Sequence, residues 1–223
     1  MSDYSIRLFE DSDGGKAREL FSRGIIEHAP GAFSHIAGLP RIWISVLVLS
    51  LLSFWITGSV PLSVLSAVVS LVTLWFCTRY VYTSYVEECL SGDMLDIRKY
   101  YLERDGCCFW VAESAGEVVG IVAAVPSSIP SSEKIVELRR MSIAKSHRGK
   151  GIAKALCRTV IDYARKAGAD AIDLETSFAQ TDAQWLYEKM GFRKTRTYYP
   201  PYIIAKFIDF HVLCYRYDFP QNR

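Results

Sequence analysis

Hydrophobic and polar positions follow two different periodicities between residues 137 and 167. Over residues 137–143 they alternate, which predicts a β-strand. The apolar residues from Ile152 to Ala164 then recur at helical spacing, which predicts an amphipathic helix. Two glycines, Gly149 and Gly151, lie in the polar turn between these elements. The pattern therefore predicts a strand, a glycine-bearing loop and a helix in one continuous run.

The same two periodicities recur along the rest of the chain and predict an α/β protein. Pro30, Gly31, Gly38 and Pro40 interrupt the pattern after the first helix and predict a linker. The sequence shows no internal repeat, so we expect a single domain over residues 1–223. The other predicted strands are 5–9, 108–112, 118–123, 171–175, a segment after Phe192 and the tail 203–217, and the other predicted helices are 16–26, 86–102 and 182–190.

A hydrophobic stretch, residues 42–78, contains no charged side chain. As one straight helix it would be about 55 Å long, well beyond the ~30 Å hydrocarbon core of a membrane. Residues 57–61 divide it into halves at 42–56 and 62–76, each about 22 Å long as a helix. The remaining domain is too small to bury so much apolar surface. We therefore predict a membrane hairpin, inserted between the first and second helices of the domain.

Charge and cysteine usage indicate where the domain lies. Basic residues flank the hydrophobic stretch almost equally, which favours both of its ends on one side of the membrane, facing the cytosol. A single tilted span is the competing interpretation. The six cysteines form no CxxC pair and no metal-binding spacing, which indicates reduced thiols and no metal. A net charge of +2 without a basic stripe gives no case for a nucleic-acid partner.

The glycine-bearing loop has the chemistry of a phosphate site. Unpaired amide N–H groups at a helix start point toward one spot, and glycines allow a phosphate to approach the backbone. Arg148 and Lys150 add positive charge, so we expect a ligand with a pyrophosphate. The loop contains no GxxxxGK[ST] motif, and the dinucleotide pattern GxGxxG fails because Lys154 stands at the third glycine position.

Two motifs resemble the GNAT superfamily of N-acetyltransferases. One is Arg148-x-x-Gly151-x-Ala153 after a strand, and the other is Leu186-Tyr187-x-x-x-Gly191-Phe192. The resemblance implies a GNAT fold, in which helices flank a mixed, mostly antiparallel sheet, and acetyl-CoA as the cosubstrate. It also implies that the backbone at two strand residues contacts the pantetheine and thioester, and that the loop binds the pyrophosphate. The implied cofactor-binding residues are Met141, Ile143, Arg148, Gly149, Lys150, Gly151, Ile152, Ala153 and Lys154.

Acyl transfer to an amine needs a base for the ammonium group and a proton for the departing thiolate. Members of the superfamily often use a glutamate at the position of Glu137 as the base, and Glu175 on the neighbouring strand is the second candidate. The motif tyrosine, Tyr187, corresponds to the proton donor. Alternation along the strand is expected to place Glu137, Arg139, Met141 and Ile143 on one face.

Two consecutive arginines on this strand, Arg139 and Arg140, are candidates for binding an acceptor carboxylate. As neighbours in a strand they are expected to point to opposite faces. Pairing with acidic neighbours or with solvent is the alternative for both. Together with Glu175, these arginines complete the set of predicted acceptor-binding residues.

Three features together resemble the camello-like branch of the superfamily, which includes N-acetylaspartate synthetase and the cysteine-S-conjugate N-acetyltransferases. They are the segment 93–101, the hydrophobic stretch and the segment 147–156, HRGKGIAKAL. The resemblance implies an enzyme of the endoplasmic reticulum membrane that acetylates the α-amino group of a small amino acid or conjugate. The alternatives are a lysine acetyltransferase acting on membrane or secretory proteins, and a non-catalytic acetyl-CoA-binding membrane scaffold. The sequence leaves the oligomeric state open.

Overall fold

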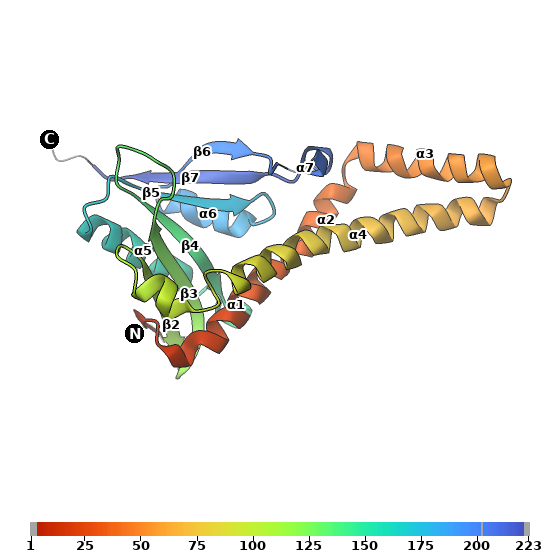
Figure 1. Cartoon of the computed structure of the whole chain (residues 1–223). Coiled ribbons are helices and arrows are strands. Elements are labelled where there is room, and N and C mark those ends of the chain that lie inside the picture. The colour runs from red at the N-terminus through yellow and green to blue at the C-terminus, as the bar shows by residue number, and fades with distance from the viewer. Residues whose placement is uncertain (1–3, 202, 221–223) are drawn as a thin grey trace.

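The central element is a seven-stranded sheet, seen in a computed structural model that describes residues 4–201 and 203–220 (Figure 1). Its strand order is β1-β2-β3-β4-β5-β7-β6, and every pair is antiparallel except β4 and β5. The mixed, mostly antiparallel sheet expected from the sequence is therefore confirmed. The strands are β1 Ser5–Leu8, β2 Cys108–Ser114, β3 Glu117–Pro126, β4 Ile135–Ile143, β5 Ala171–Ser177, β6 Arg193–Tyr198 and β7 Val212–Asp218.

Helices cover both faces of the sheet. On one face, α1 and the end of α4 bury their apolar side chains against β2 and β3. On the other face, α5 and α6 form a second core with β3, β4, β5 and β7. The helices are α1 Gly14–Ile26, α2 Ala29–Ala37, α3 Pro40–Thr57, α4 Val60–Ser91, α5 Ile152–Lys166, α6 Thr181–Lys189 and α7 Ile203–Phe207, with short helical turns at Asp11–Asp13, Arg98–Leu102 and Lys145–His147.

Helix α1 lies very close to strand β4. The Ser142 hydroxyl donates to the carbonyl of Leu20 at 2.8 Å. A Cβ atom at Gly24 would lie 2.1 Å from the Ser142 Oγ, so this approach depends on the missing side chain of a glycine. The contact fixes one end of β4 against the α1 face of the sheet.

A β-bulge in β4 changes the faces expected from simple alternation. Arg140 has a positive φ of 56°, and the register against β3 shifts at this point, so one extra residue sits in β4. As a result Met141 and Ile143 pack against the α5 core. Arg139 is paired with Ala123, which belongs to the α1 core, so it faces the α1 side together with Glu137. The prediction that these four residues share one face is wrong.

Arg140 also faces the α1 side, because its guanidinium lies 5.2 Å from the ring centroid of Phe21 in α1. The prediction that Arg139 and Arg140 point to opposite faces is therefore wrong. The physical reason is again the extra residue, since a bulge breaks the period of two on which the expectation rested.

Three predicted segments differ from the structure. The predicted linker is α2, because Pro30 lies in the first helical turn, where proline is tolerated, and Ala29, Ala32 and Ile36 are fully buried. The predicted helix 86–102 is instead the end of α4 followed by a turn and a short π-helix. The predicted tail strand begins only at Val212, since Ile203–Phe207 is helical.

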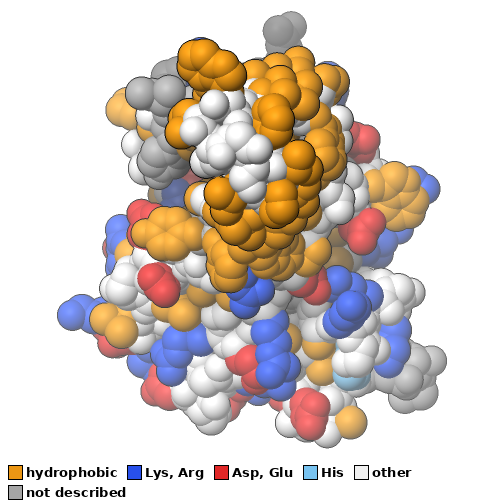
Figure 2. Space-filling view, turned by 90° about the vertical axis from the view of Figure 1, so that its right-hand side faces the viewer, with side chains coloured by type: hydrophobic (Ala, Val, Ile, Leu, Met, Phe, Trp, Pro, Cys, Tyr) orange, Lys and Arg blue, Asp and Glu red, His pale blue; other side chains and the backbone are white. Residues whose placement is uncertain are grey.

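The hydrophobic stretch forms an antiparallel pair, α3 and α4, that projects from one end of the sheet (Figure 1). Both helices are long and apolar enough to cross a membrane, and in the most apolar 18 residues of each almost none is buried. Viewed end-on, apolar side chains cover this pair, whereas charged side chains cover the remainder of that face (Figure 2). Serines join the helices, since the Ser63 hydroxyl donates to the Ser50 carbonyl at 2.7 Å. The helical hairpin expected from the sequence is present.

We predict that Gly24→Ala destabilises the fold by about 1–3 kcal/mol, because the added methyl group overlaps the Ser142 hydroxyl and pushes α1 from β4. Gly15→Ala is the matched control in the same helix, since its Cβ would meet nothing within 4 Å. It should instead raise stability by about 0.5 kcal/mol through a smaller loss of backbone entropy. Thermal unfolding followed by circular dichroism measures both, and equal midpoints for the two variants would contradict the close packing.

Candidate active site

The site forms where the pairing between β4 and β5 stops. The parallel ladder ends at Leu138 and Leu174, so residues 139–143 of β4 have a strand neighbour only in β3. Groups on the two faces of the sheet can therefore approach one another through the gap between β4 and β5. Residues of the α1 face and residues of the α5 face approach the same opening in the ladder.

The loop between β4 and α5 leaves a run of backbone amides unpaired. Gly149 and Gly151 have φ values of 77° and 82°, a left-handed conformation that favours glycine. Ala155 is the first residue of this helix start whose amide donates to a backbone carbonyl, that of Gly151, at 3.0 Å. Among the described residues, no acceptor is bonded to the amides of residues 149–154. This arrangement suits an anion at the positive end of the α5 dipole.

Arg148 turns away from these amides. Its guanidinium donates to the carbonyl of Ile143 at 3.2 Å and pairs with the carboxylate of Glu27, at the end of α1. These residues line a cavity of about 680 Å³ between α1, the start of β3 and the loop. Arg148 thus ties the loop to α1 and caps the end of β4.

A basic groove continues from the other side of the loop, between α5 and α6. Its volume is about 400 Å³, and its cationic side chains come from Lys154, Arg158, Arg165 and Lys189. Asp162 is the one acid that lines it, and Arg165 pairs with that carboxylate at 2.8 Å. The groove therefore extends the positive potential of the helix start along α5.

Tyr187 lies on the α5 face, packed between aromatic rings. It is 5% exposed, and its ring centroid lies 5.7 Å from that of Phe192 and 6.2 Å from that of Tyr215. No hydrogen bond joins its hydroxyl to another described residue. Burial raises the pKa of the Tyr187 phenol, and the neighbouring Cys157 thiol adds to the effect. The hydroxyl is therefore a protonated donor without a protein acceptor.

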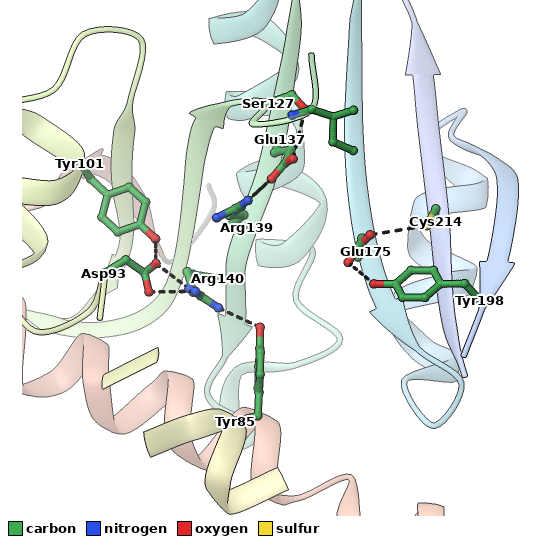
Figure 3. A network of polar contacts seen from close by, with 11 residues as sticks. Tyr85, Asp93, Tyr101, Ser127, Glu137, Arg139, Arg140, Glu175, Tyr198 and Cys214 are labelled. Atoms are coloured by element: carbon green, nitrogen blue, oxygen red, sulfur yellow. Dashed lines mark hydrogen bonds and ion pairs between the residues drawn. The ribbon is translucent and has the colours of Figure 1, made fainter. Parts of the chain in front are cut away.

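Glu137 and Arg139 form an ion pair on the α1 face (Figure 3). The Nε atom of Arg139 donates to Glu137 Oε2 at 2.6 Å, and the Ser127 hydroxyl donates to Oε1 at 3.2 Å. Burial lowers the pKa of Arg139, but the Glu137 carboxylate outweighs burial and raises it above its ordinary value. The pair places a carboxylate and a guanidinium side by side beside the opening in the ladder.

Glu175 lies on β5 just beyond the end of the ladder, two residues after Asp173, which is the partner of Glu137, and it is across from β4 (Figure 3). Its carboxylate accepts a hydrogen bond from the Tyr198 hydroxyl at 2.9 Å and one from the Cys214 thiol at 3.6 Å. Among the described residues it forms no ion pair, although its charge contributes to the raised pKa of Arg196 on β6. Nearby, Asp173 keeps one buried carboxylate oxygen without a hydrogen bond, because Arg216 approaches it only to 3.9 Å. Burial raises the pKa of Asp173, while Arg216 opposes the rise.

Arg140 is held in a separate network on the same face (Figure 3). It donates twice to Asp93, at 2.8 Å each, and once to the hydroxyl of Tyr85 at 2.8 Å. The Tyr101 hydroxyl also donates to Asp93. Burial lowers the pKa of Arg140, but the Asp93 carboxylate and the neighbouring tyrosines outweigh it and raise the pKa.

The structure thus brings the predicted residues into two groups. Glu137, Arg139 and Glu175 lie on the α1 face, whereas Tyr187 and the loop belong to the α5 face. Sequence reasoning missed Ser127 and Tyr198, which lie in segments with no motif of their own. Strand alternation in 193–198 places Tyr198 on the same face as Arg196, but it does not pair that face with Glu175.

Comparisons with known proteins identify this arrangement. A profile of the acetyltransferase (GNAT) family matches residues 73–192. The chain belongs to the GNAT acetyltransferase family. The resemblance noted in the sequence is confirmed, and the protein is an acetyl-CoA-dependent N-acetyltransferase. The described residues contain no group of three or more potential metal ligands.

Curated relatives place this GNAT enzyme in the N-acetyltransferase 8 family, the camello-like branch. It is 40% identical over 223 residues to N-acetyltransferase 8 of Rattus norvegicus, covering 100% of both chains. It is also 40% identical over 223 residues to N-acetyltransferase 8B of Homo sapiens, covering 99% of this chain and 97% of that protein. The crystal structure of a GNAT-family acetyltransferase from Staphylococcus aureus Mu50 shares the fold, with a TM-score of 0.57, 16% identity and coverage of 96% and 98% of the two chains.

Proposed function

We propose that this protein is a membrane-anchored enzyme that moves the acetyl group of acetyl-CoA to the α-amino group of a small amino acid or amino-acid conjugate. The observation that carries the proposal is the opening in the β4–β5 ladder. It has a phosphate-type loop and a proton donor on one face and a carboxylate beside a guanidinium on the other. Two substrates can therefore approach each other from opposite faces of the sheet.

The loop and the basic groove supply the groups that bind the phosphates of the cosubstrate. The free amides of residues 149–154 suit its pyrophosphate, and Lys154 with the cations along α5 suits further phosphate charge. Met141 and Ile143 lie on the same face as α5, so their backbone is in position for the pantetheine arm. Arg148 contributes indirectly, because its contacts with Ile143 and Glu27 hold the loop in place.

In the proposed reaction Glu137 takes a proton from the acceptor ammonium group, directly or through water. The free amine nitrogen attacks the thioester carbonyl carbon, a C–N bond forms and the C–S bond breaks. Tyr187 then donates its phenolic proton to the departing thiolate, and the proton left on the new amide nitrogen passes to solvent or to the tyrosinate. Glu175 is the second candidate for the base, because its carboxylate faces the same opening.

The α1 face also favours an acceptor that carries a carboxylate. Arg139 is one-third exposed and forms a planar fork beside Glu137, so an α-carboxylate can share its guanidinium while the amine meets a glutamate. A lysine side chain in a protein offers the amine without that carboxylate. This pairing supports an aspartate-like amino acid or a cysteine S-conjugate over a lysine acceptor. Arg140 has no part in acceptor binding in this proposal, because Asp93 and Tyr85 already hold its guanidinium.

Membrane anchoring is the second part of the proposal. Helix α3 has 18 residues and is about 27 Å long, close to the ~30 Å hydrocarbon core of a bilayer. Trp55, 85% exposed, sits at the far end next to the turn, as an interfacial tryptophan would. An antiparallel pair returns the chain to the side from which it started. The resemblance to the camello-like branch suggests the endoplasmic reticulum membrane, and the nearly balanced basic flanks favour a catalytic domain that faces the cytosol.

Gly151→Ala should weaken CoA binding about tenfold, because a side chain at a φ of 82° costs roughly 1–2 kcal/mol and the loop relaxes out of the geometry that aligns its amides. Gly168→Ala is the control, since it carries a similar φ of 68° beyond the other end of α5 and its Cβ meets nothing within 4 Å. Isothermal titration with CoA compares them. Equal losses of affinity would remove the loop from the binding site.

Glu137→Gln and Tyr187→Phe should each lower kcat about 100-fold in a CoA-release assay, because each removes one proton-transfer group. Tyr163→Phe on α5, whose ring packs against Trp110, should leave kcat near the wild-type value. The assay is run with free amino acids, cysteine S-conjugates and lysine peptides. Turnover with peptides alone would favour the lysine acetyltransferase, and binding of CoA without turnover of any acceptor would favour the scaffold.

A cysteine at Ser59, in the turn of the hairpin, should be shielded from an impermeant maleimide in sealed microsomes and labelled after permeabilisation. A cysteine at Ser131, in the loop after β3, should be labelled without permeabilisation, because it lies on the side of the catalytic domain. Both are placed in a Cys77→Ser background, since Cys77 is itself exposed. Immediate labelling of both positions would show that the hairpin does not cross the bilayer.

A further inference from the structure

The bulge residue Arg140 adopts a backbone conformation that its side chain does not favour. Its φ of 56° lies in the left-handed region, where a non-glycine residue costs free energy and persists only if the surroundings hold it. The bulge sits in the part of β4 that has lost β5 as a neighbour. Within the sheet, β3 is therefore the one strand that pairs with β4 there, and this pairing shifts register at the bulge.

A buried group of side chains provides the missing support. The side chains of Arg140 and Asp93 are 11% and 8% exposed, and their two hydrogen bonds form a fork. The ring of Tyr85 lies 5.9 Å from the guanidinium, and its hydroxyl completes the hydrogen bonding of Nη1. The Tyr101 hydroxyl donates a further hydrogen bond to the Asp93 carboxylate. Both carboxylate oxygens of Asp93 and all three nitrogens of Arg140 therefore take part in hydrogen bonds, which favours a single geometry for this ion pair.

These partners come from the segment that continues the hairpin. Tyr85 lies in α4, the same uninterrupted helix that contains the apolar half of the anchor, and Asp93 follows its last turn. The ring of Phe21 in α1 packs against the guanidinium. The bulge of β4 is thereby braced against the base of the hairpin rather than against a neighbouring strand.

We propose that Asp93, Tyr85 and Arg140 are positioning residues that fix the bulge in β4 and, through it, the acetyl-transfer geometry. The inference rests on the proposed function and deepens it. The bulge decides that Glu137 and Arg139 face the acceptor side while Met141 and Ile143 face the cosubstrate side. Loss of the brace allows the strand to return toward regular pairing, which turns Met141 and Ile143 away from the cosubstrate side and onto the face of Glu137 and Arg139. The brace touches neither substrate.

The test compares Asp93→Asn, Tyr85→Phe, Arg140→Lys and Arg140→Gly in the full-length protein. Asp93→Asn is expected to lower kcat about 100-fold, as a misplacement of reacting groups does. Tyr85→Phe, the mildest change, is expected to lower kcat about tenfold by removing one hydrogen bond to a charged group. The dissociation constant of CoA should be unchanged in both, because the phosphate loop is untouched. Proportional loss of CoA affinity and kcat would overturn a positioning role.

Arg140→Gly separates the backbone from the side chain. Glycine tolerates the left-handed conformation without strain, so full activity in this variant would show that the bulge needs no brace and would overturn the proposal. We expect Arg140→Gly to be as impaired as Arg140→Lys, which keeps the charge but loses the fork. The matched control is Arg98→Lys, which alters an exposed ion pair with Asp11 and should leave kcat unchanged.

Hydrogen–deuterium exchange keeps this inference separable from the proposed function. Asp93→Asn should accelerate exchange of the amides of residues 139–143 and leave those of β2 protected, whether or not an acceptor is known. Uniform acceleration across the sheet, or none at residues 139–143, would overturn the brace. If exchange responds as expected but the wild-type protein acetylates no amine, the proposed function fails and the brace stands as a structural feature.

Discussion

Strand β4 has a hydrogen-bonded neighbour on both edges only as far as Leu138, and the rest of the molecule is arranged around that limit. Beyond it, the strand is held by β3 on one edge, by α1 through Ser142 on one face, and by the ion pair of Arg140 with Asp93. An open edge inside a sheet is costly unless something uses its backbone groups. Under the proposed function, a cosubstrate arm that pairs with β4 would satisfy that requirement at the open edge.

The sequence predicts most of the elements, because long periodic segments such as 152–164 and alternating ones such as 108–112 report burial directly. The loop and Tyr187 can also be predicted from the sequence, because each belongs to a short motif of consecutive residues. It does not predict the bulge, because no residue type marks it: Arg140 takes a left-handed conformation that usually belongs to glycine. One unrecognised residue then places Glu137 and Met141 on opposite faces.

The two wrongly predicted helical segments have a related explanation, which is that tertiary contacts override local sequence preferences. Pro30 and Gly31 have the composition of a linker, but burial of Ala29, Ala32 and Ile36 outweighs their low helix propensity. Helix α4 was expected to end with the apolar stretch, yet it continues to Ser91 because Tyr82 and Val86 bury against the domain. Tertiary contacts decide both cases, and these are invisible to a local pattern. A continuous α4 also leaves no hinge between the hairpin and the brace of β4.

The charges on the α1 face constrain the acceptor further. Glu137 is already paired with Arg139, whereas Glu175 has only neutral donors, Tyr198 and Cys214. The face therefore presents one neutral ion pair and one carboxylate that forms no ion pair among the described residues, although it attracts Arg196. A zwitterionic amino acid complements this arrangement, because its ammonium group balances a glutamate while its carboxylate shares the guanidinium. The second carboxylate of an acceptor such as aspartate must find its cation elsewhere, since Arg140 and Arg216 are each committed to acidic partners. Under the proposed function, the ammonium and carboxylate groups of the acceptor are therefore the parts that this face is expected to recognise.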